Sequence, residues 1–397
     1  SIDHRKHEVF RKQALLLEGD QELVDGRSFG RISALAVHDV DLDENGRGVV
    51  LAADRGGRQA EQDRQESRGH ENRLRETASA GKYCSAVWTE RIDGINVPGA
   101  ALALAAGDGL AWLDSQLDGP DGRYSFLANE PVERHLRRFG GEAPFSRFPG
   151  ESADREDASE GPAPSCVPRW IGYVAYDAAW SKPTPGRPRF DRGEAPVVLF
   201  HRYDAVLVID HQEGQAWLVG DDAAACRRLR ARLGGPRPAE PSEFEVSALS
   251  VDDPRAHREA IERALAHIAA GDVYEVNVAR RWLARFEGSA LALWLRMREA
   301  SQVPLGMFFD AGDHSVLACT MERFLRWDAG TRRLVTRPIK GTVRRMPGDD
   351  EAKARLLADP KERAEHSMIV DLMRNDLGRV ARVGTVQVEA PLVVEPF

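Results

Sequence analysis

The sequence has few cysteines, no long apolar run and no secretion signal. Its four cysteines, Cys84, Cys166, Cys226 and Cys319, lie far apart and form no C-x-x-C pair, so they predict neither a zinc site nor a disulfide framework. No apolar run approaches the ~18 residues that a membrane span needs, and the N-terminal residues lack the apolar core of a signal peptide. We therefore expect a cytoplasmic protein without membrane segments.

Positive charge is also in short supply. The 397 residues include 63 acidic and 55 basic side chains, which gives a formal net charge of -8. The basic side chains are scattered rather than clustered, so the sequence argues against nucleic acid as a partner. Glycine-rich phosphate loops of the G-x-G-x-x-G and Walker A types are absent as well, so nucleotide binding has no support.

What is present is an apolar share of 42%, which is ample for the cores of two ordinary domains. Dense mixed charge at 51–82 leaves residues 1–90 unassigned, as a segment that we expect to be partly disordered or a solvated helix. Short apolar runs separated by turn residues then favour antiparallel sheet. The stretch 233–246 is rich in proline and glycine, as linkers are. The sequence thus predicts one domain at 91–240 and a second at 241–397.

Two helices are predicted in the second domain. The first spans 254–270, with Pro254 in its first turn, apolar residues at helical spacing and Gly271 as its stop. The second begins after Asp359, the predicted N-cap, and runs to about residue 374. Residues 272–282, between them in sequence, predict a strand.

Residues 315–327 and 332–343 flank the turn sequence "DAGT" and predict a β-hairpin. A loop at 329–330 would place Glu322 opposite Arg337 and point the side chains of Glu322 and Lys340 to opposite faces. A slip of one residue would reverse this, and the sequence does not fix the register.

Lys340, within "TRPIKGTVRR", has two readings. It is either a solvated surface charge or a nucleophile, because only a desolvated or specifically paired lysine becomes a reagent. Arg337 and Arg344 lie close in sequence, where they would favour a neutral amine or bind an anionic substrate. They are equally compatible with ordinary surface charges.

Glu365 also has two readings. It falls in line with the apolar residues Met368, Ile369 and Leu372 on the last helix, and a carboxylate on a core-facing stripe needs a partner. That partner is either a metal, for which magnesium is the natural choice, or Lys361 in an exposed pair one turn earlier.

Four motifs carry a family resemblance. In this order, "GDVYEVNVARRW" (271–282), "MERF" (321–324), "TRPIKGTVRR" (336–345) and "KERAEHSMIVDLMRNDLGRV" (361–380) closely resemble the chorismate-utilising enzymes. A weaker likeness, in "WLDSQLDGPDGRYSFLANEP" and "WIGYVAYD", extends it over roughly 96–397. The resemblance implies an α+β fold, an anthranilate synthase component I-like antiparallel β-sandwich with flanking helices. The chain stops at "VVEPF", where family members continue into further motifs and a second magnesium glutamate, so we expect an incomplete chorismate domain with little catalysis.

The resemblance also assigns roles to residues. Lysine after Pro-Ile, where anthranilate synthases carry alanine, resembles the aminodeoxychorismate synthases, and implies that Lys340 attacks C2 of chorismate and expels the C4 hydroxyl before ammonia adds at C4. Glu322 would transfer a proton, Gly341 and Thr342 would shape the floor of the substrate pocket, and Glu365 would bind Mg²⁺.

The implied partners are chorismate and a separate glutamine amidotransferase subunit that supplies ammonia. The segment Leu113, Asp114 and Ser115 matches the one that holds tryptophan in relatives, either as a feedback inhibitor or as a structural ligand. One departure is Glu275, which stands where the family usually has glutamine; another is Thr320-Met321 in place of Ser-Pro. The alternatives are anthranilate synthase component I and a truncated, non-catalytic paralogue that binds a partner subunit or a ligand.

Overall fold

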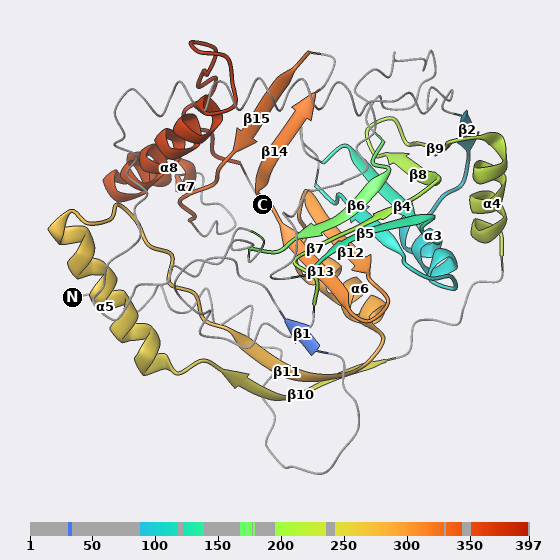
Figure 1. The fold of residues 1–397 in the computed structure, drawn as a ribbon, viewed down its shortest axis with the longest axis horizontal. Helices are drawn as coiled ribbons and strands as arrows, with labels where there is room; N and C mark the ends of the chain where they lie inside the picture. The colour runs from blue at the N-terminus through green and yellow to red at the C-terminus, as the bar shows by residue number, and fades with distance from the viewer. Residues whose placement is uncertain are drawn as a thin grey trace, which may run out of the picture.

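The computed structural model describes residues 31–33, 88–117, 122–138, 167–176, 178, 195–235, 243–328, 331–343 and 351–395 (Figure 1). Most of the segment 1–90, together with Cys84, Cys166 and Arg344, lies outside these described residues. None of the helices within the described ranges combines the length and the apolar character that a bilayer span requires.

A seven-stranded antiparallel sheet forms the centre of the fold, in the order β13-β12-β3-β4-β8-β9-β2. Its strands are β2 Trp88–Ile92, β3 Ala111–Asp114, β4 Tyr124–Ala128, β8 Ala205–Asp210, β9 Gln215–Gly220, β12 Leu305–Asp310 and β13 Ser315–Thr320. The sheet therefore joins strands from both sides of the predicted domain boundary at 240/241, and the division into two domains stays a prediction.

A different layer covers each face of this sheet. Helices α3 (Val97–Leu104), α4 (Ala223–Leu233) and α6 (Ala290–Ala300) cover one face (Figure 1). A three-stranded sheet of β5 (Glu133–Arg137), β7 (Val198–Arg202) and β6 (Trp170–Val174), in that order, covers the other.

Successive residues of a strand point to opposite faces, so each strand feeds both layers. On β12, Phe308 belongs to the helix-side core with Trp294, whereas its neighbour Phe309 belongs to the core against the second sheet. Trp112 meets Trp294 edge-on, with ring centroids 6.0 Å apart. The antiparallel sheets with their flanking helices confirm the predicted α+β fold.

His201, on β7, is a fully buried histidine in the second core. Its ring packs 4.7 Å from that of Phe309, and Nε2 has no hydrogen-bond partner among the described residues. Burial lowers the pKa of His201 to about 4, helped by Arg134 and His314 and opposed by Asp310. The imidazole is therefore neutral in the folded protein.

We expect the folded protein to lose stability as the pH falls from about 6.5 to about 4. In this window the unfolded chain protonates its histidine and the folded chain does not, which gives up to about 3 kcal/mol of pH-dependent destabilisation. His201→Leu should flatten this dependence, because it removes the proton site at similar volume. Urea unfolding at pH 8, 6 and 5 gives the free energy of unfolding at each pH. If this free energy falls with pH equally steeply in the parent and in His201→Leu, the prediction is contradicted.

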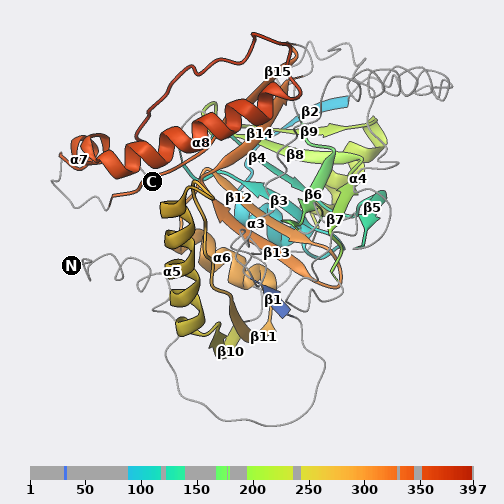
Figure 2. The same ribbon diagram turned by 60° about the vertical axis from the view of Figure 1, so that its left-hand side comes forward.

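The remaining elements lie to one side of the central sheet. A three-stranded sheet has the order β1 (Arg31–Ser33), β11 (Trp282–Gly288) and β10 (Phe244–Val251). The chain continues through the long helix α5 (Pro254–Ala270), the hairpin of β14 (Arg323–Asp328) and β15 (Arg333–Arg337), and the helices α7 (Ala352–Ala358) and α8 (Pro360–Gly378). Figure 2 shows α8 beside the hairpin and α5 below α8.

Helix α5 confirms the bounds predicted from its caps. Asp253 accepts a hydrogen bond from the Arg255 N–H, and Gly271 ends the helix in the left-handed conformation, with φ of 81°. Its apolar face is less buried than the periodicity suggests, because only Ala264 of that face is buried and the side chain of Leu265 is 60% exposed.

The predicted strand at 272–282 is wrong, because β11 begins only at Trp282. The last ladder pair joins Val251 to Trp282, and β10 then gives way to the N-cap of α5. Residues 273–281 thus have no neighbouring strand among the described residues, and without ladder hydrogen bonds an apolar, β-prone sequence does not form a strand.

The hairpin β14–β15 forms, but its register differs from the one that a loop at 329–330 gives. Arg323, not Glu322, faces Arg337, and the pairing shifts between Arg323 and Arg326. Such an irregularity inserts an extra residue and bends the strand. Glu322 therefore lies just before β14 and outside the ladder.

Candidate active site

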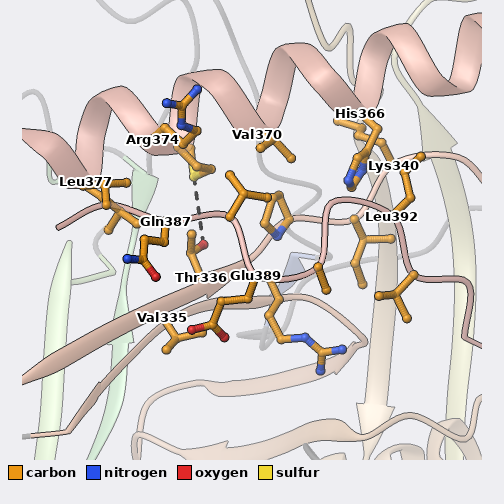
Figure 3. A pocket seen from close by; sticks show the side chains of 18 of the residues that line it. Val335, Thr336, Lys340, His366, Val370, Arg374, Leu377, Gln387, Glu389 and Leu392 are labelled. Carbon is orange, nitrogen blue, oxygen red and sulfur yellow. Dashed lines mark hydrogen bonds between the residues drawn. The ribbon is translucent and has the colours of Figure 1, made fainter. Parts of the chain in front are cut away.

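A cleft of about 2000 Å³ lies between β15, α8 and residues 380–395 (Figure 3). It exceeds the ~300–1,000 Å³ of ordinary ligand pockets, so it has room for a small substrate. Thr336 from β15 and Met373 from α8 meet across it, with the hydroxyl 4.0 Å from the sulfur.

Residues 380–395 are tied to the walls of this cleft by polar contacts. Arg337 binds Glu395 at 2.5 Å, and Arg333 binds Glu389. The His366 Nε2 donates a hydrogen bond to the Pro391 carbonyl at 2.8 Å. Figure 3 shows Gln387, Glu389 and Leu392 opposite α8.

The face of α8 that borders the cleft is not the one predicted. It carries residues at a spacing of three or four, namely Glu362, His366, Val370, Met373 and Leu377. The predicted stripe of Met368 and Leu372 is 44% and 50% exposed. Both sets repeat at helical spacing, so only packing against β15 selects between them. The helix also continues four residues past the predicted end, to Gly378.

The N-terminus of α8 is the predicted one. Asp359 is the N-cap, and its carboxylate accepts hydrogen bonds from the backbone N–H groups of Lys361 and Glu362. Pro360 occupies the first turn, where its missing N–H costs no intrahelical bond. This cap fixes the residue at which the helix starts. It thereby fixes the position of Glu362, in the first turn, beside the loop that carries Lys340.

Lys340 is held by a specific partner rather than solvated. Its ammonium donates to the Glu275 carboxylate, with Nζ 2.7 Å from Oε1, and the two side chains are only 22% and 21% exposed. Pro338 follows the end of β15 and cannot extend its ladder. The chain therefore leaves the strand just before Lys340, which lines the cleft.

Gly341 fixes the turn that follows Lys340. Its φ is 77°, and an added Cβ would lie 3.0 Å from the Glu362 Oε2 and 3.3 Å from the Leu356 side chain. Gly341 and Thr342 both line the cleft, in keeping with their predicted place at the pocket floor. Their binding of substrate stays a prediction.

We expect Gly341→Ala to destabilise the protein by about 1–2 kcal/mol and to displace Lys340. A left-handed conformation costs an alanine about this much, and Glu362 and Leu356 must also move aside. Thermal unfolding measures the loss, with Gly378→Ala as the control, because no atom lies within 4 Å of the added methyl there. Equal melting temperatures for the two variants would contradict a strained role for Gly341.

Glu322 lies next to this loop. The Ile339 N–H donates to its Oε1 at 3.3 Å, so the carboxylate is held one residue from Lys340. It is exposed and does not line the cleft. Its proton-transfer role stays a prediction.

Of the two partners that the sequence left open for Glu365, a metal ion or Lys361, the structure shows Lys361. Lys361 lies one turn earlier, and its Nζ is 2.5 Å from the Glu365 Oε1. The hydrogen bond to Glu365 raises the pKa of Lys361. Among the described residues no group of three or more histidine, cysteine or acidic side chains could hold a metal ion. The donor set is therefore incomplete, and magnesium binding by Glu365 stays a prediction.

The predicted tryptophan-like ligand site lies in the central sheet, away from the cleft. Asp114 is 3% exposed, and its carboxylate accepts hydrogen bonds from Trp112, Ser125 and Arg298, the last at 2.6 Å. The Ser115 hydroxyl donates to the Pro304 carbonyl, and Leu113 pairs with Met307 on β12. The polar side chains thus bind other parts of the protein, and ligand binding stays a prediction.

Two residues near Lys340 received no role from the sequence. Glu275 stood out only as a departure from glutamine, and nothing in the sequence analysis singled out His366. The spacing of His366 from Val370, Met373 and Leu377 was a usable signal for the cleft face of α8. No signal pointed to the pair of Glu275 and Lys340, because 65 residues separate them.

Comparison with known proteins gives a consistent family. The sequence model described as chorismate binding enzyme matches residues 107–397. Anthranilate synthase component 1 of Thermus thermophilus is 38% identical over 240 residues, which cover 57% of this chain and 51% of that protein. Aminodeoxychorismate synthase component 1 of Klebsiella aerogenes is 36% identical over 233 residues, with the same coverage of 57% and 51%.

A solved structure supports the fold. Anthranilate synthase component I from Streptococcus pneumoniae superposes with a TM-score of 0.53 and 25% sequence identity, covering 72% of this chain and 68% of that chain. This chain spans about half, 51%, of the length of the two curated relatives.

Proposed function

Because the chain belongs to the chorismate binding enzyme family, we propose that it is the chorismate-aminating component of an aminodeoxychorismate synthase. It converts chorismate and ammonia into 4-amino-4-deoxychorismate, a precursor of 4-aminobenzoate and folate. A separate glutamine amidotransferase subunit supplies the ammonia. Relatives named as aminodeoxychorismate synthases and as anthranilate synthases match about equally well, so the choice between them rests on the site.

The observation that carries the proposal is the position of Lys340. This lysine follows Pro-Ile, lines the cleft and is held by one carboxylate at 2.7 Å. Expulsion of a hydroxyl is a hard displacement, which a covalent intermediate divides into two easier steps. An amine in the cleft supplies the nucleophile for the first step, and ammonia releases it in the second.

The test is a mass-resolved analysis of products from this purified chain, incubated with chorismate, Mg²⁺ and excess ammonium. 4-Amino-4-deoxychorismate supports the proposal. Anthranilate and pyruvate would instead assign the chain to the second candidate, anthranilate synthase component I, which the 38% identity to the Thermus thermophilus protein favours. Unchanged chorismate from a folded protein that binds an amidotransferase subunit would point to a non-catalytic binding protein.

Magnesium is part of the proposal through Glu365. When bound, the ion would neutralise a substrate carboxylate, and Mg²⁺ is commonly held by one or two protein carboxylates together with substrate oxygens. Since Lys361 binds Glu365 in the structure, the ion must displace that ammonium.

We therefore expect Lys361→Met to lower the Mg²⁺ concentration needed for half-maximal amination by about threefold to tenfold, because it removes the competing charge. Glu365→Gln should raise that concentration at least tenfold. Magnesium titrations of both variants measure the effect, with Glu299→Gln, an exposed position near the end of α6 and outside the cleft, as the control. If the Mg²⁺ titration curves of Lys361→Met and Glu365→Gln coincide with that of the parent, Glu365 does not bind the ion.

A further inference from the structure

We propose that Glu275 positions the amine of Lys340 and accepts its proton when that amine becomes a nucleophile. The inference rests on the proposed function, which requires Lys340 to form a bond through nitrogen. The observation behind it is the contact of 2.7 Å between Nζ and Oε1, made by side chains that are 22% and 21% exposed. Nothing in the family resemblance assigns a role to Glu275.

An ammonium has no lone pair with which to attack, so Lys340 must give up a proton before it can form a bond through nitrogen. A general base must lie within about 2.6–3.2 Å of the proton that it takes, and the Glu275 carboxylate meets this requirement. A glutamine at this position would hold the amine by a hydrogen bond but could not take the proton. The glutamate therefore adds a function that the usual family residue lacks.

Each proton that moves during the cycle can be traced, and Lys340 and Glu275 end the cycle in the protonation states in which they began. The Lys340 proton moves to Glu275, the nitrogen lone pair forms a bond to C2, the ring double bond shifts and the C4–O bond breaks. The hydroxyl takes a proton from solvent and leaves as water. Ammonia then bonds to C4 and returns one proton to solvent. The C2–N bond breaks with its electron pair on Lys340, which regains its proton from Glu275.

The other charged groups around Lys340 have different partners. Glu322 accepts from the Ile339 N–H, and Arg337 binds Glu395. The Glu362 carboxylate, beside Gly341, lies 3.8 Å from the Lys361 ammonium, and His366 donates to the Pro391 carbonyl. The second oxygen of Glu275 is buried without a hydrogen-bond partner among the described residues, whereas its first oxygen accepts from the ammonium of Lys340.

The first test needs no enzyme activity. Acetic anhydride acylates only neutral amines, so the acetylation rate of Lys340, followed by peptide mass spectrometry, reports how firmly its proton is held. Glu275→Gln keeps the size and one hydrogen-bond acceptor and removes the charge. We expect it to speed acetylation of Lys340 about tenfold, because the carboxylate that binds the ammonium is removed, while exposed Lys353 reacts at the parent rate. An unchanged Lys340 rate overturns the inference.

The second test is the pH dependence of amination. At pH 7 Glu275→Gln should lower kcat about 10²-fold, the lower range for loss of a general base, because the amine loses the carboxylate that positions it and takes its proton during the attack on C2. The rate of this variant should rise with pH, because solvent must now take the proton. Glu275→Asp, which keeps the carboxylate, should recover much of the rate and the parent profile. If Glu275→Gln lowers kcat by the same factor at every pH, Glu275 has only a structural role. If the parent yields no aminated product, the proposed function fails, and acetylation still decides whether Glu275 controls the amine.

Discussion

Lys340→Ala is expected to abolish amination of chorismate, with a loss of kcat of at least ~10³-fold. In the proposed function Lys340 is the nucleophile, so its removal closes the covalent route and leaves only binding and electrostatic stabilisation. Lys340 lies in the cleft and donates to Glu275 at 2.7 Å, so no other described lysine can take its place from the same loop. Product analysis with excess ammonium measures the effect without an amidotransferase subunit.

Two further variants separate nucleophilicity from charge. Lys340→Arg keeps the positive charge beside Glu275 but offers no comparable nucleophile, so it should be as inactive as Lys340→Ala. Lys353→Ala, which removes an exposed lysine at the edge of the same cleft, should retain the parent rate. Circular dichroism confirms that each variant is folded. Full amination by Lys340→Arg would show that charge is sufficient and would remove Lys340 as the nucleophile.

Asp114→Ala is expected to destabilise the protein by about 3–5 kcal/mol. The carboxylate is buried, and the guanidinium of Arg298 lies 2.6 Å away with 20% exposure. Removing one partner of a buried ion pair leaves an uncompensated charge, which is the costly part. Trp112 and Ser125 would also lose their acceptor. Against the 5–15 kcal/mol that holds a typical domain together, this is a large loss.

The midpoint of urea unfolding measures this prediction. The matched control is Asp93→Ala, because Asp93 pairs with Arg91 in an exposed bridge, 85% and 60% accessible, and such pairs contribute at most about 1 kcal/mol. Combining Asp114→Ala with Arg298→Met should cost less than the two single changes together. A midpoint for Asp114→Ala equal to that of Asp93→Ala would contradict the core role. Tryptophan titration of the parent separately tests the predicted ligand role.

Local sequence signals located the helices α5 and α8, and they failed where a contact with a distant segment decided the outcome. Asp253 and Asp359 fixed the starts of α5 and α8 because a cap depends on residues within one turn. The strand predicted at 272–282 needed a neighbouring strand that the fold does not provide. The register of β14 and β15 depended on an irregularity that no turn residue announces.

The candidate site divides in the same way. Residue types and motif order pointed to Lys340, Gly341 and Thr342, and all three line the cleft. The side of α8 that meets the cleft was mispredicted, because two apolar stripes on one helix have the same period and only packing distinguishes them. Both readings of Glu365 were open in sequence, and the tertiary structure shows the contact with Lys361.

By itself the sequence determined the family motifs, the caps of α5 and α8 and the preference for antiparallel sheet, since each depends on residues a few positions apart. Only the tertiary structure decided that one antiparallel sheet joins strands from both sides of residue 240, and that Glu275 binds Lys340. Both are pairings between distant segments. Their geometry follows from how the whole chain packs, and no local spacing encodes it.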